Sequence, residues 1–397
     1  MKIAYVYCNE ISSQEANINQ TFNMLYSLGK DNEVTFFSNF ISKKALNNNL
    51  RFFQIKKNFK IKKMFSLFSD SFKLTEFFMR FIYSIQTLIT LKLGDFDVIY
   101  TRDFSFLLFC SYLPKWLKPK QKIIFENHTI YYLTSKKVSF NQEKKALNEA
   151  DFFIPISKGV EKDLIGIFKV KKDKILVLQD GVNLENFTKI RSNINYIYKK
   201  YPLSKNKKII VYTGSFKEWK GVDVLVKSSK FLTDKNIFYL IIGGKKEEIH
   251  SLNELIYKEN LLKKNILLEK MLPQREVIKI LKSSDVAIIP NKKITIGEKY
   301  TSPLKLFEYL ACGLPIIASN LPSMKEVLKE NQNALFFKTE NEEDLANKIE
   351  LLLKNKRLCL ELKRNNIRLS KDYSWDSRAN KITEVINHET NNKKTLQ

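Results

Sequence analysis

Short apolar segments alternate with amphipathic helical patterns along almost the whole chain of 397 residues. This alternation is typical of an α/β protein, because two parallel strands are usually joined by a crossover helix. In the first half, the pattern predicts a helix at residues 20–28 and strands at residues 2–8, 33–37, 96–100, 122–125, 151–155 and 175–178. These elements predict one doubly wound, Rossmann-like domain over residues 1–191.

The second half repeats the pattern, and the chain is long enough for two domains. The sequence predicts helices from residue 222 and at 251–262, 275–282 and 342–353, and strands at 208–213, 238–242, 265–268, 286–289, 315–318 and 334–337. A second domain is therefore predicted at residues 208–372. Residues 192–207 are polar and lysine-rich, show no apolar face, and are predicted to link the two domains. A last helix is predicted at 373–388 and a disordered tail at 389–397.

The composition limits the classes of partner. The net charge is +26, from 68 basic and 42 acidic residues, which suits nucleic acid, anionic lipid or a nucleotide ligand. No recognised nucleic-acid-binding module accompanies the charge, so no nucleic-acid partner is expected. The four cysteines form no CxxC pair, which predicts free thiols in a reducing cytosol. The N-terminal residues fit a strand rather than a signal peptide, and no apolar run is long enough to span a membrane.

The stretch at residues 51–81 interleaves basic and large apolar residues at roughly helical spacing. Such a stretch can lie in a membrane interface, where anionic lipid attracts its basic side chains. The same pattern also fits two helices that pack on their own sheet and leave their lysines in water. Both interpretations remain open from the sequence.

Residues 299–320, KYTSPLKLFEYLACGLPIIASN, predict a loop, a helix, a tight turn and a buried strand. Ser302 is predicted to cap the helix, Pro303 to take its first position, and Gly313 to end it in a left-handed conformation. Free backbone N–H groups at the helix N-terminus favour an anion such as a diphosphate. Glu308, on the less apolar side of the helix, is predicted to accept hydrogen bonds from sugar hydroxyls.

Further candidates follow other strands of the second domain, because ligands of parallel sheets bind beyond the carboxyl ends of the strands. Gly214 allows a backbone to approach closely after the strand at 208–213, and Lys220 can neutralise a diphosphate there. A surface lysine is the alternative for Lys220. Gly243 and Gly244 follow the strand at 238–242 and fit either a ligand contact or a generic tight turn.

Two basic residues follow strands of the first domain. His128 can donate to a sugar hydroxyl or hold an acceptor, and a structural histidine is the alternative. Arg102 can bind an acceptor phosphate, although a structural ion pair with Asp103 fits the sequence equally well. Asp95 and Asp97 form the one Asp-x-Asp motif, but they stand where a strand begins. We therefore expect no metal site.

The stretch SPLKLFEYLACGLPIIAS resembles the donor-binding core of retaining glycosyltransferases of the GT-B fold, of the family 4 type. The resemblance implies two Rossmann-like, doubly wound α/β domains that face a central cleft, with the last helix returning to the first domain. It implies transfer of a sugar from a UDP- or GDP-linked donor to a hydroxyl with retention of configuration, without a metal or further cofactor. The setting that it suggests is bacterial surface polysaccharide synthesis on a lipid-linked acceptor, in the cytoplasm or on the inner face of the membrane.

The resemblance also assigns roles to residues. Met271 and Leu272 match a loop that lines the nucleobase, with a core position as the alternative for Met271. Tyr300 stands where the family has the first of two glutamates, and Ser215 stands where it has an arginine. The predicted catalytic residues are His128, Lys220 and Glu308, and Arg102 and His128 are predicted on the acceptor side. The predicted donor-binding residues are Gly214, Ser215, Lys220, Gly243, Gly244, Met271, Leu272, Tyr300, Ser302, Pro303, Leu304 and Glu308.

Three other functions are weighed against transfer. The departures at Tyr300 and Ser215 suit a non-catalytic subunit that binds a partner enzyme. A nucleotide-sugar epimerase of the same fold would need acid and base carboxylates that face the sugar. An NAD-dependent dehydrogenase is disfavoured because no GxGxxG motif follows the first strand.

Overall fold

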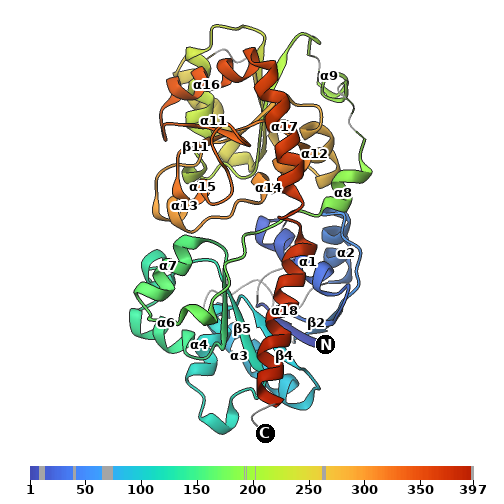
Figure 1. Cartoon of the computed structure of the whole chain (residues 1–397), viewed down its shortest axis with the longest axis vertical. Helices are drawn as coiled ribbons and strands as arrows, with labels where there is room; N and C mark the ends of the chain where they lie inside the picture. Colours follow the sequence, from blue (N-terminus) through green and yellow to red (C-terminus); the bar gives the residue numbers. More distant parts are fainter. Residues whose placement is uncertain are drawn as a thin grey trace. The chain divides into compact units, whose positions relative to one another are not determined.

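The computed structural model describes residues 1–8, 14–38, 42–64, 75–191, 193, 195–201, 203–261 and 265–394, without the side chains of 75–77 and 391–394. The chain divides into two compact units (Figure 1). Unit 1 comprises Met1–Gln179 and Trp375–Gln397, and unit 2 comprises Asp180–Ser374. Residues 9–13, residues 65–74 of the predicted interfacial stretch, and Pro202 lie outside the described residues.

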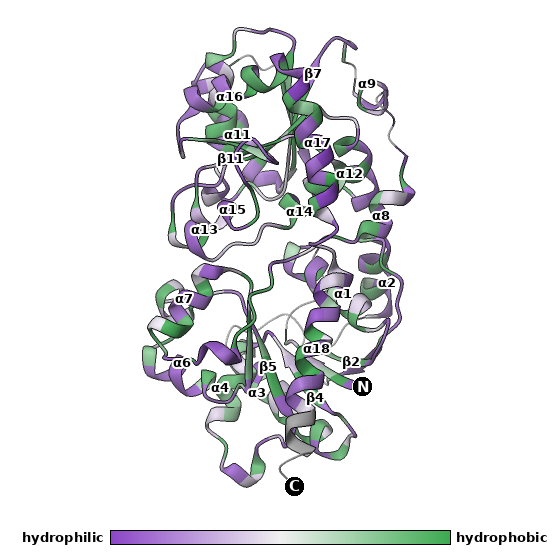
Figure 2. Cartoon of the chain, in the orientation of Figure 1, coloured by the Kyte–Doolittle hydropathy of each residue, from purple (hydrophilic) through white to green (hydrophobic). Residues whose placement is uncertain are grey.

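Unit 1 is built on a parallel sheet of six strands in the order β3-β2-β1-β4-β5-β6. The strands are β1 Lys2–Val6, β2 Glu33–Ser38, β3 Lys60–Lys63, β4 Val98–Thr101, β5 Lys122–Asn127 and β6 Phe152–Pro155. The inner strands are almost wholly buried, as expected for a parallel sheet covered on both faces. Figure 2 shows this as hydrophobic colouring along β5.

Several helices of unit 1 begin at side chains that satisfy free backbone N–H groups. Asp103 caps α4, Ser157 caps α7, and Ser139 with Gln142 forms a capping box on α6. The helices are α1 Ala16–Leu28, α2 Lys43–Phe52, α3 Thr75–Leu93, α4 Phe104–Ser111, α5 Tyr131–Thr134, α6 Phe140–Leu147, α7 Lys158–Gly166 and α18 Trp375–Lys394, with 3₁₀ turns η1 Lys115–Leu117 and η2 Lys172–Lys174.

Unit 2 holds a second parallel sheet of six strands, in the order β12-β11-β10-β7-β8-β9. Its strands are β7 Lys208–Thr213, β8 Ile237–Gly244, β9 Ile266–Lys270, β10 Val286–Ile289, β11 Ile316–Ser319 and β12 Ala334–Phe337. Its helices are α8 Leu184–Lys189, α9 Tyr196–Lys200, α10 Val222–Ser228, α11 Lys246–Lys258, α12 Gln274–Leu281, α13 Thr295–Lys299, α14 Leu304–Cys312, α15 Pro322–Lys325, α16 Glu342–Lys354 and α17 Lys356–Ser370, with 3₁₀ turns η3 Glu218–Lys220 and η4 Ser229–Phe231. Asn341 caps α16, since its side chain accepts from the Asp344 N–H.

Two predictions in unit 1 are wrong. The stretch at 51–81 is not helical throughout, because Lys60–Lys63 forms edge strand β3 beside β2. The segment at 175–178 is not a strand of the sheet: Ile175 makes an isolated bridge to Phe153, and two backbone bonds from Leu176 and Leu178 to β6 complete the contact.

The predicted linker at 192–207 also differs from the structure. The chain passes from unit 1 to unit 2 between Gln179 and Asp180, before this segment. Ile197 and Tyr201, on and just after α9, are buried in the unit 2 core, so the segment does have an apolar face. The last helix, α18, continues to Lys394, beyond the predicted start of the tail at residue 389.

A buried ion pair holds helix α18 against strand β5 within unit 1. The Nη1 atom of Arg378 lies 2.9 Å from Oε2 of Glu126, near the end of β5. Arg378 is 4% exposed and Glu126 is 1% exposed. Arg378 also donates through Nε to the backbone oxygen of Gln179 at 3.0 Å. The Arg378 guanidinium and the contact with His128, which oppose the effect of burial, hold the pKa of Glu126 well below its usual range. Glu126 is therefore an anion inside the fold.

Replacing Arg378 with Met should destabilise unit 1 by about 3–5 kcal/mol, because it leaves the Glu126 carboxylate buried without its partner. We would measure urea unfolding by fluorescence in a Trp219→Phe background, where the remaining tryptophans, Trp116 and Trp375, both belong to unit 1.

The matched control for this prediction is Lys30→Met, which removes an exposed ion pair between the turn after α1 and Asp376 of the same helix α18. Exposed pairs contribute about 0–1 kcal/mol, so its unfolding midpoint should stay near that of the parent. Equal midpoints for the two variants would contradict the assigned role of Arg378.

Candidate functional site

The loops that follow β7 and β8 touch each other at the carboxyl edge of the unit 2 sheet. Gly214 has a φ of 127° and Gly243 a φ of 116°, which L side chains rarely adopt. The Gly214 N–H donates to the Ile242 oxygen at 2.8 Å. A Cβ at Gly243 would lie 2.6 Å from the Gly214 oxygen, and one at Gly244 would lie 2.4 Å from the Phe216 ring. These glycines therefore let two backbones pack directly at the predicted site.

Lys220 is the last residue of the short turn η3, which follows Gly214 in the sequence. Its Nζ atom lies 3.6 Å from the centroid of the Trp219 ring. Burial and the positive charge of Lys217 lower the pKa of Lys220 to about 7. Among the described residues, Lys220 forms no ion pair, and no carboxylate opposes this shift. A half-buried cation without a counter-charge favours an anionic ligand.

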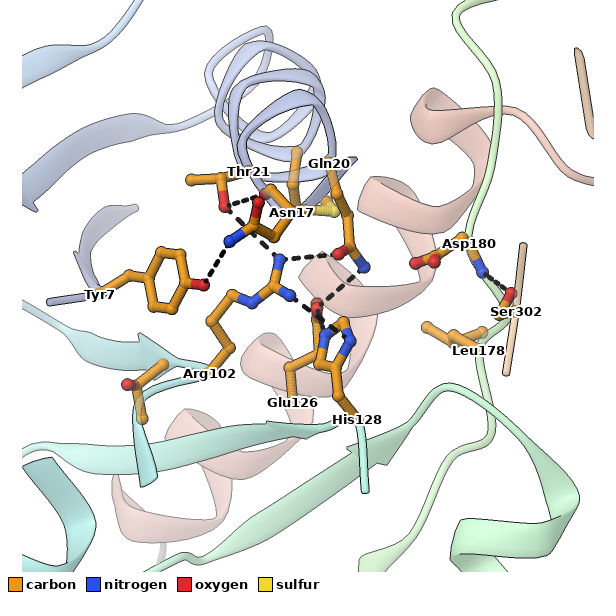
Figure 3. A network of polar contacts seen from close by, with 12 residues as sticks. Tyr7, Asn17, Gln20, Thr21, Arg102, Glu126, His128, Leu178, Asp180 and Ser302 are labelled. Atoms are coloured by element: carbon orange, nitrogen blue, oxygen red, sulfur yellow. Dashed lines mark hydrogen bonds and ion pairs between the residues drawn. The ribbon is translucent and has the colours of Figure 1, made fainter. Parts of the chain in front are cut away.

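Helix α14 begins differently from the prediction. Its N-cap is Pro303, whose side chain forms no cap, and its first residue is Leu304. The Ser302 Oγ atom instead accepts from the Asp180 N–H at 2.8 Å (Figure 3), so it fastens the entry segment of unit 2. The predicted end of the helix is confirmed, since Gly313 has a φ of 65°.

Glu308 lies half-buried on α14. The Gln274 Nε2 atom donates to its Oε1 at 3.4 Å. Burial raises the pKa of Glu308 to about 7, although Gln274 and the positive charge of Lys305 oppose the rise. At neutral pH this carboxyl group can therefore either accept or donate a hydrogen bond. On the next residue, the Tyr309 hydroxyl accepts from the Thr213 N–H at 2.8 Å, which ties α14 to the end of β7.

The sequence reasoning missed Lys305, on the first turn of α14. Its side chain is 6% exposed, and its Nζ atom lies 3.5 Å from the centroid of the Tyr212 ring. A Cβ at Gly214 would stand 3.1 Å from that Nζ atom. Burial, and then the charge of Lys220, hold the pKa of Lys305 well below its usual range. The available signal was a lysine in the first turn of a helix already predicted to bind an anion.

The other predicted donor residues differ in exposure. Met271 is 38% exposed after β9, so a core position is excluded for it, whereas Leu272 packs partly against the unit 2 core. Tyr300 is 3% exposed, and Leu304 is half-buried. The Ser215 backbone oxygen accepts from the Tyr212 hydroxyl at 2.8 Å. Gly214, Lys220, Lys305 and Glu308 carry the polar chemistry of this edge.

A second polar cluster lies at the carboxyl edge of the unit 1 sheet (Figure 3). Arg102 donates through Nη1 to Gln20 Oε1 at 2.7 Å and through Nη2 to His128 Nδ1 at 3.4 Å. The His128 Nε2 atom lies 2.6 Å from Glu126 Oε1. Because arginine only donates, Nδ1 accepts, and the ring is neutral with its proton on Nε2. Burial and the Arg102 charge accordingly lower the pKa of His128 to about 4.

This geometry favours the structural alternative for the His128 ring, because both of its nitrogens already have partners. Asp103 accepts from the Ser105 N–H at 2.9 Å and the Cys8 N–H at 2.6 Å, so its carboxylate serves the backbone. Asp95 and Asp97 both bind Lys2, at the start of β4 and away from the carboxyl edge.

Comparison with known proteins agrees with this geometry. Residues 194–369 match the model "Glycosyl transferases group 1", and residues 25–186 match "Glycosyltransferase Family 4". The chain belongs to this glycosyltransferase family. It is 28% identical over 279 residues to an uncharacterized glycosyltransferase of Methanocaldococcus jannaschii, covering 66% of this chain and 68% of that protein.

A further relative is the N,N'-diacetylbacillosaminyl-diphospho-undecaprenol alpha-1,3-N-acetylgalactosaminyltransferase of Campylobacter jejuni. It is 30% identical over 200 residues, which are 49% of this chain and 50% of that one. Another uncharacterized glycosyltransferase of Methanocaldococcus jannaschii is 22% identical. The match covers 62% of this chain and 64% of that protein. The chain thus spans about half to two thirds of these curated relatives.

Solved structures show the fold. A glycosyltransferase of Rickettsia africae superimposes with a TM-score of 0.75 at 19% identity, covering 98% of each chain. HepE of Anabaena, in complex with UDP and glucose, gives a TM-score of 0.73 at 14% identity, covering 98% of this chain and 99% of that one. With its two six-stranded parallel sheets, the protein has the predicted GT-B fold. In the part of the chain that the structure describes, no helix combines the length and apolarity needed to cross a bilayer.

Gly243→Ala should lower the thermal stability of unit 2 by about 1–3 kcal/mol, because its new Cβ strains the backbone and displaces the Gly214 loop. Calorimetry would measure the shift. The matched control is Gly166→Ala at the exposed end of α7, where a Cβ meets nothing within 4 Å. This control should be neutral or slightly stabilising, and similar losses in both variants would disprove the packing argument.

Proposed function

We propose that this protein transfers a sugar from a UDP- or GDP-linked donor to a hydroxyl acceptor, with retention of anomeric configuration. The observation that carries the proposal is the uncompensated Lys220, which shares one edge of the sheet with Gly214 and the N-terminus of α14. A diphosphate supplies the negative charge that this edge lacks. The neighbour HepE, solved with UDP and UDP-glucose, supports a nucleotide-sugar donor.

Four donor-side residues have a role in this proposal. Lys220 and the α14 dipole stabilise the diphosphate as negative charge develops on it. Glu308, whose carboxyl group both accepts and donates near neutral pH, binds the donor ribose. Met271 and Leu272 line the nucleobase. No metal or further cofactor has a role.

Arg102 and His128 are proposed on the acceptor side. Because both nitrogens of the His128 ring have protein partners, it orients the Arg102 guanidinium rather than transferring a proton. The acceptor is proposed to be lipid-linked, in bacterial surface polysaccharide synthesis. The Campylobacter relative, whose name includes a diphospho-undecaprenol group, supports this class of acceptor.

A basic and apolar surface of unit 1 supports a cytoplasmic protein that binds the inner face of the membrane. Leu93 at the end of α3 is 84% exposed, and Trp116 in η1 is 76% exposed. The two segments are neighbours, since Lys92 Nζ donates to the Trp116 oxygen at 3.1 Å. Lys115 adds a further basic side chain. Exposed Trp and Leu beside lysines suit the interface of an anionic bilayer.

A non-catalytic partner subunit is the second candidate. The departures from the family pattern favour it, since Tyr300 is buried where a sugar-binding glutamate is usual, and Ser215 replaces an arginine. An epimerase is a weaker candidate. Detectable turnover of a nucleotide sugar would exclude the non-catalytic alternative.

Calorimetric titration with UDP and GDP tests the donor site. Wild type should bind one of them, and Lys220→Ala should weaken that affinity by about tenfold or more, because it removes a charge-assisted contact with phosphate. Lys235→Ala, an exposed lysine just before β8 at the opposite edge of the sheet, should bind like wild type.

Two outcomes of this titration contradict the proposal. If wild type binds neither nucleotide at millimolar concentration, the donor proposal fails. If Lys220→Ala binds as tightly as wild type, the assigned role of Lys220 fails.

Sedimentation with vesicles tests the membrane surface. Wild type should sediment with anionic phosphatidylglycerol vesicles at low salt, and less as salt rises, because ions screen the attraction. Leu93→Ser with Trp116→Ser should abolish most of this binding. Tyr257→Ser removes an equally exposed aromatic ring from unit 2 and should have no effect. Equal sedimentation of all three proteins would refute this surface.

A further inference from the structure

Lys305 is a buried basic residue that forms no ion pair among the described residues, although the charge of Glu308 acts on it. Its side chain is 6% exposed, and its Nζ atom has no hydrogen-bond partner. A buried ammonium without an acceptor is strongly unfavourable, and such groups in proteins are normally paired. The nearest described carboxylate along the helix, Glu308, forms no ion pair with it and has a pKa raised to about 7 by burial. The protein alone therefore leaves this site incomplete.

The surroundings of Lys305 identify the chemistry that is missing. The Tyr212 ring lies 3.5 Å from Nζ and compensates part of its charge. The Gly214 turn lies on another side, close enough that a Cβ there would stand 3.1 Å from Nζ. The charge of Lys220 acts on Lys305 and lowers its pKa further, after the larger effect of burial. Two cations and a glycine turn share one place, and an anion satisfies all of them.

We propose that Lys305 binds the diphosphate of the donor together with Lys220, at the N-terminus of the nine-residue helix α14. This inference rests on the proposed function for the identity of the ligand. The helix N-terminus adds its partial positive charge to the two lysines. Tyr212 acts as a positioning residue, because its ring lies against the ammonium and its hydroxyl holds the Ser215 oxygen.

Lys305 also explains how the site functions with a serine at position 215. The group 1 pattern has an arginine there, and that arginine would extend from the turn that follows β7. In this chain Lys305 reaches the same turn from α14, since a Cβ at Gly214 would stand 3.1 Å from its Nζ atom. Lys305 thus supplies a positive charge at the turn where the resemblance implies an arginine.

Binding should also take up protons. A buried lysine whose pKa is depressed loses its proton readily in the free protein, and a bound diphosphate restores the charged form. Because the pKa of Lys220 is also lowered, to about 7, proton uptake on binding is expected at and above neutral pH. The affinity should fall as the pH rises further, because the free lysines are then increasingly neutral.

Calorimetric titration of three proteins with UDP, GDP and inorganic pyrophosphate tests the inference. Lys305→Met should bind the preferred nucleotide and pyrophosphate about 10- to 100-fold more weakly than wild type. Lys235→Met, at the opposite edge of the sheet, is the matched control and should bind normally. Without ligand, Lys305→Met should melt at a higher temperature than wild type, because the unpaired buried charge is gone. A lysine with a purely structural role would show a lower melting temperature instead.

A second variant tests the relation between positions 305 and 215. Adding Ser215→Arg to Lys305→Met should restore at least tenfold of the lost affinity, because the arginine returns a cation to the same turn.

Titrations of wild type at pH 8 in phosphate-free buffers of different ionisation enthalpy should show proton uptake, which Lys305→Met reduces. The proton uptake of wild type does not depend on the stability of any variant.

The outcomes separate this inference from the proposed function. If Lys305→Met binds as tightly as wild type, or if wild type takes up no proton, the role of Lys305 is overturned while the donor proposal stands. If wild type binds pyrophosphate but neither nucleotide, and Lys305→Met loses that binding, Lys305 remains an anion ligand and the donor proposal fails. If wild type binds none of the three, both are overturned.

Discussion

Helices cover both faces of the two parallel sheets, so the inner strands of each unit have almost no contact with water. Buried on both sides, these strands accept almost only apolar residues, and the polar chemistry of each unit is confined to the strand ends. Gly214, Glu126 and His128 all lie at the carboxyl edge of their sheets. In unit 2, the direct contact of Gly214 with Gly243 brings two of these ends together and makes the edge available to a ligand.

The two edges differ in how their charges are balanced. In unit 1, Glu126 is surrounded by the Arg378 and Arg102 cations and by a neutral imidazole, so the cluster is largely satisfied by the protein itself. In unit 2, Lys220 and Lys305 form no ion pair among the described residues, although the charge of Glu308 acts on Lys305. A satisfied cluster stabilises and orients, whereas an unsatisfied one binds. This contrast supports our proposal that the donor binds to unit 2.

Much of the fold was predictable, because apolar runs such as those at β7, β10 and β12 directly predict buried strands. Strand β3 was missed because its sequence, KIKK, carries one apolar residue, as edge strands often do. At the site, Gly313 was predicted from local backbone geometry, but Ser302 was assigned wrongly because its true partner, Asp180, is distant in sequence. Lys305 was missed for the same kind of reason, since its burial depends on tertiary contacts with Tyr212 and Gly214.

The course of the chain through the two units has a consequence for its synthesis. Unit 2 is one continuous segment inserted between the two parts of unit 1, so helix α18 of unit 1 is translated after the whole of unit 2. Glu126 is therefore without Arg378 until all of unit 2 has been synthesised. Although synthesis of unit 1 begins first, unit 2 is the first to have all of its residues. Until α18 has been synthesised, the rest of unit 1 lacks the cation that pairs with Glu126.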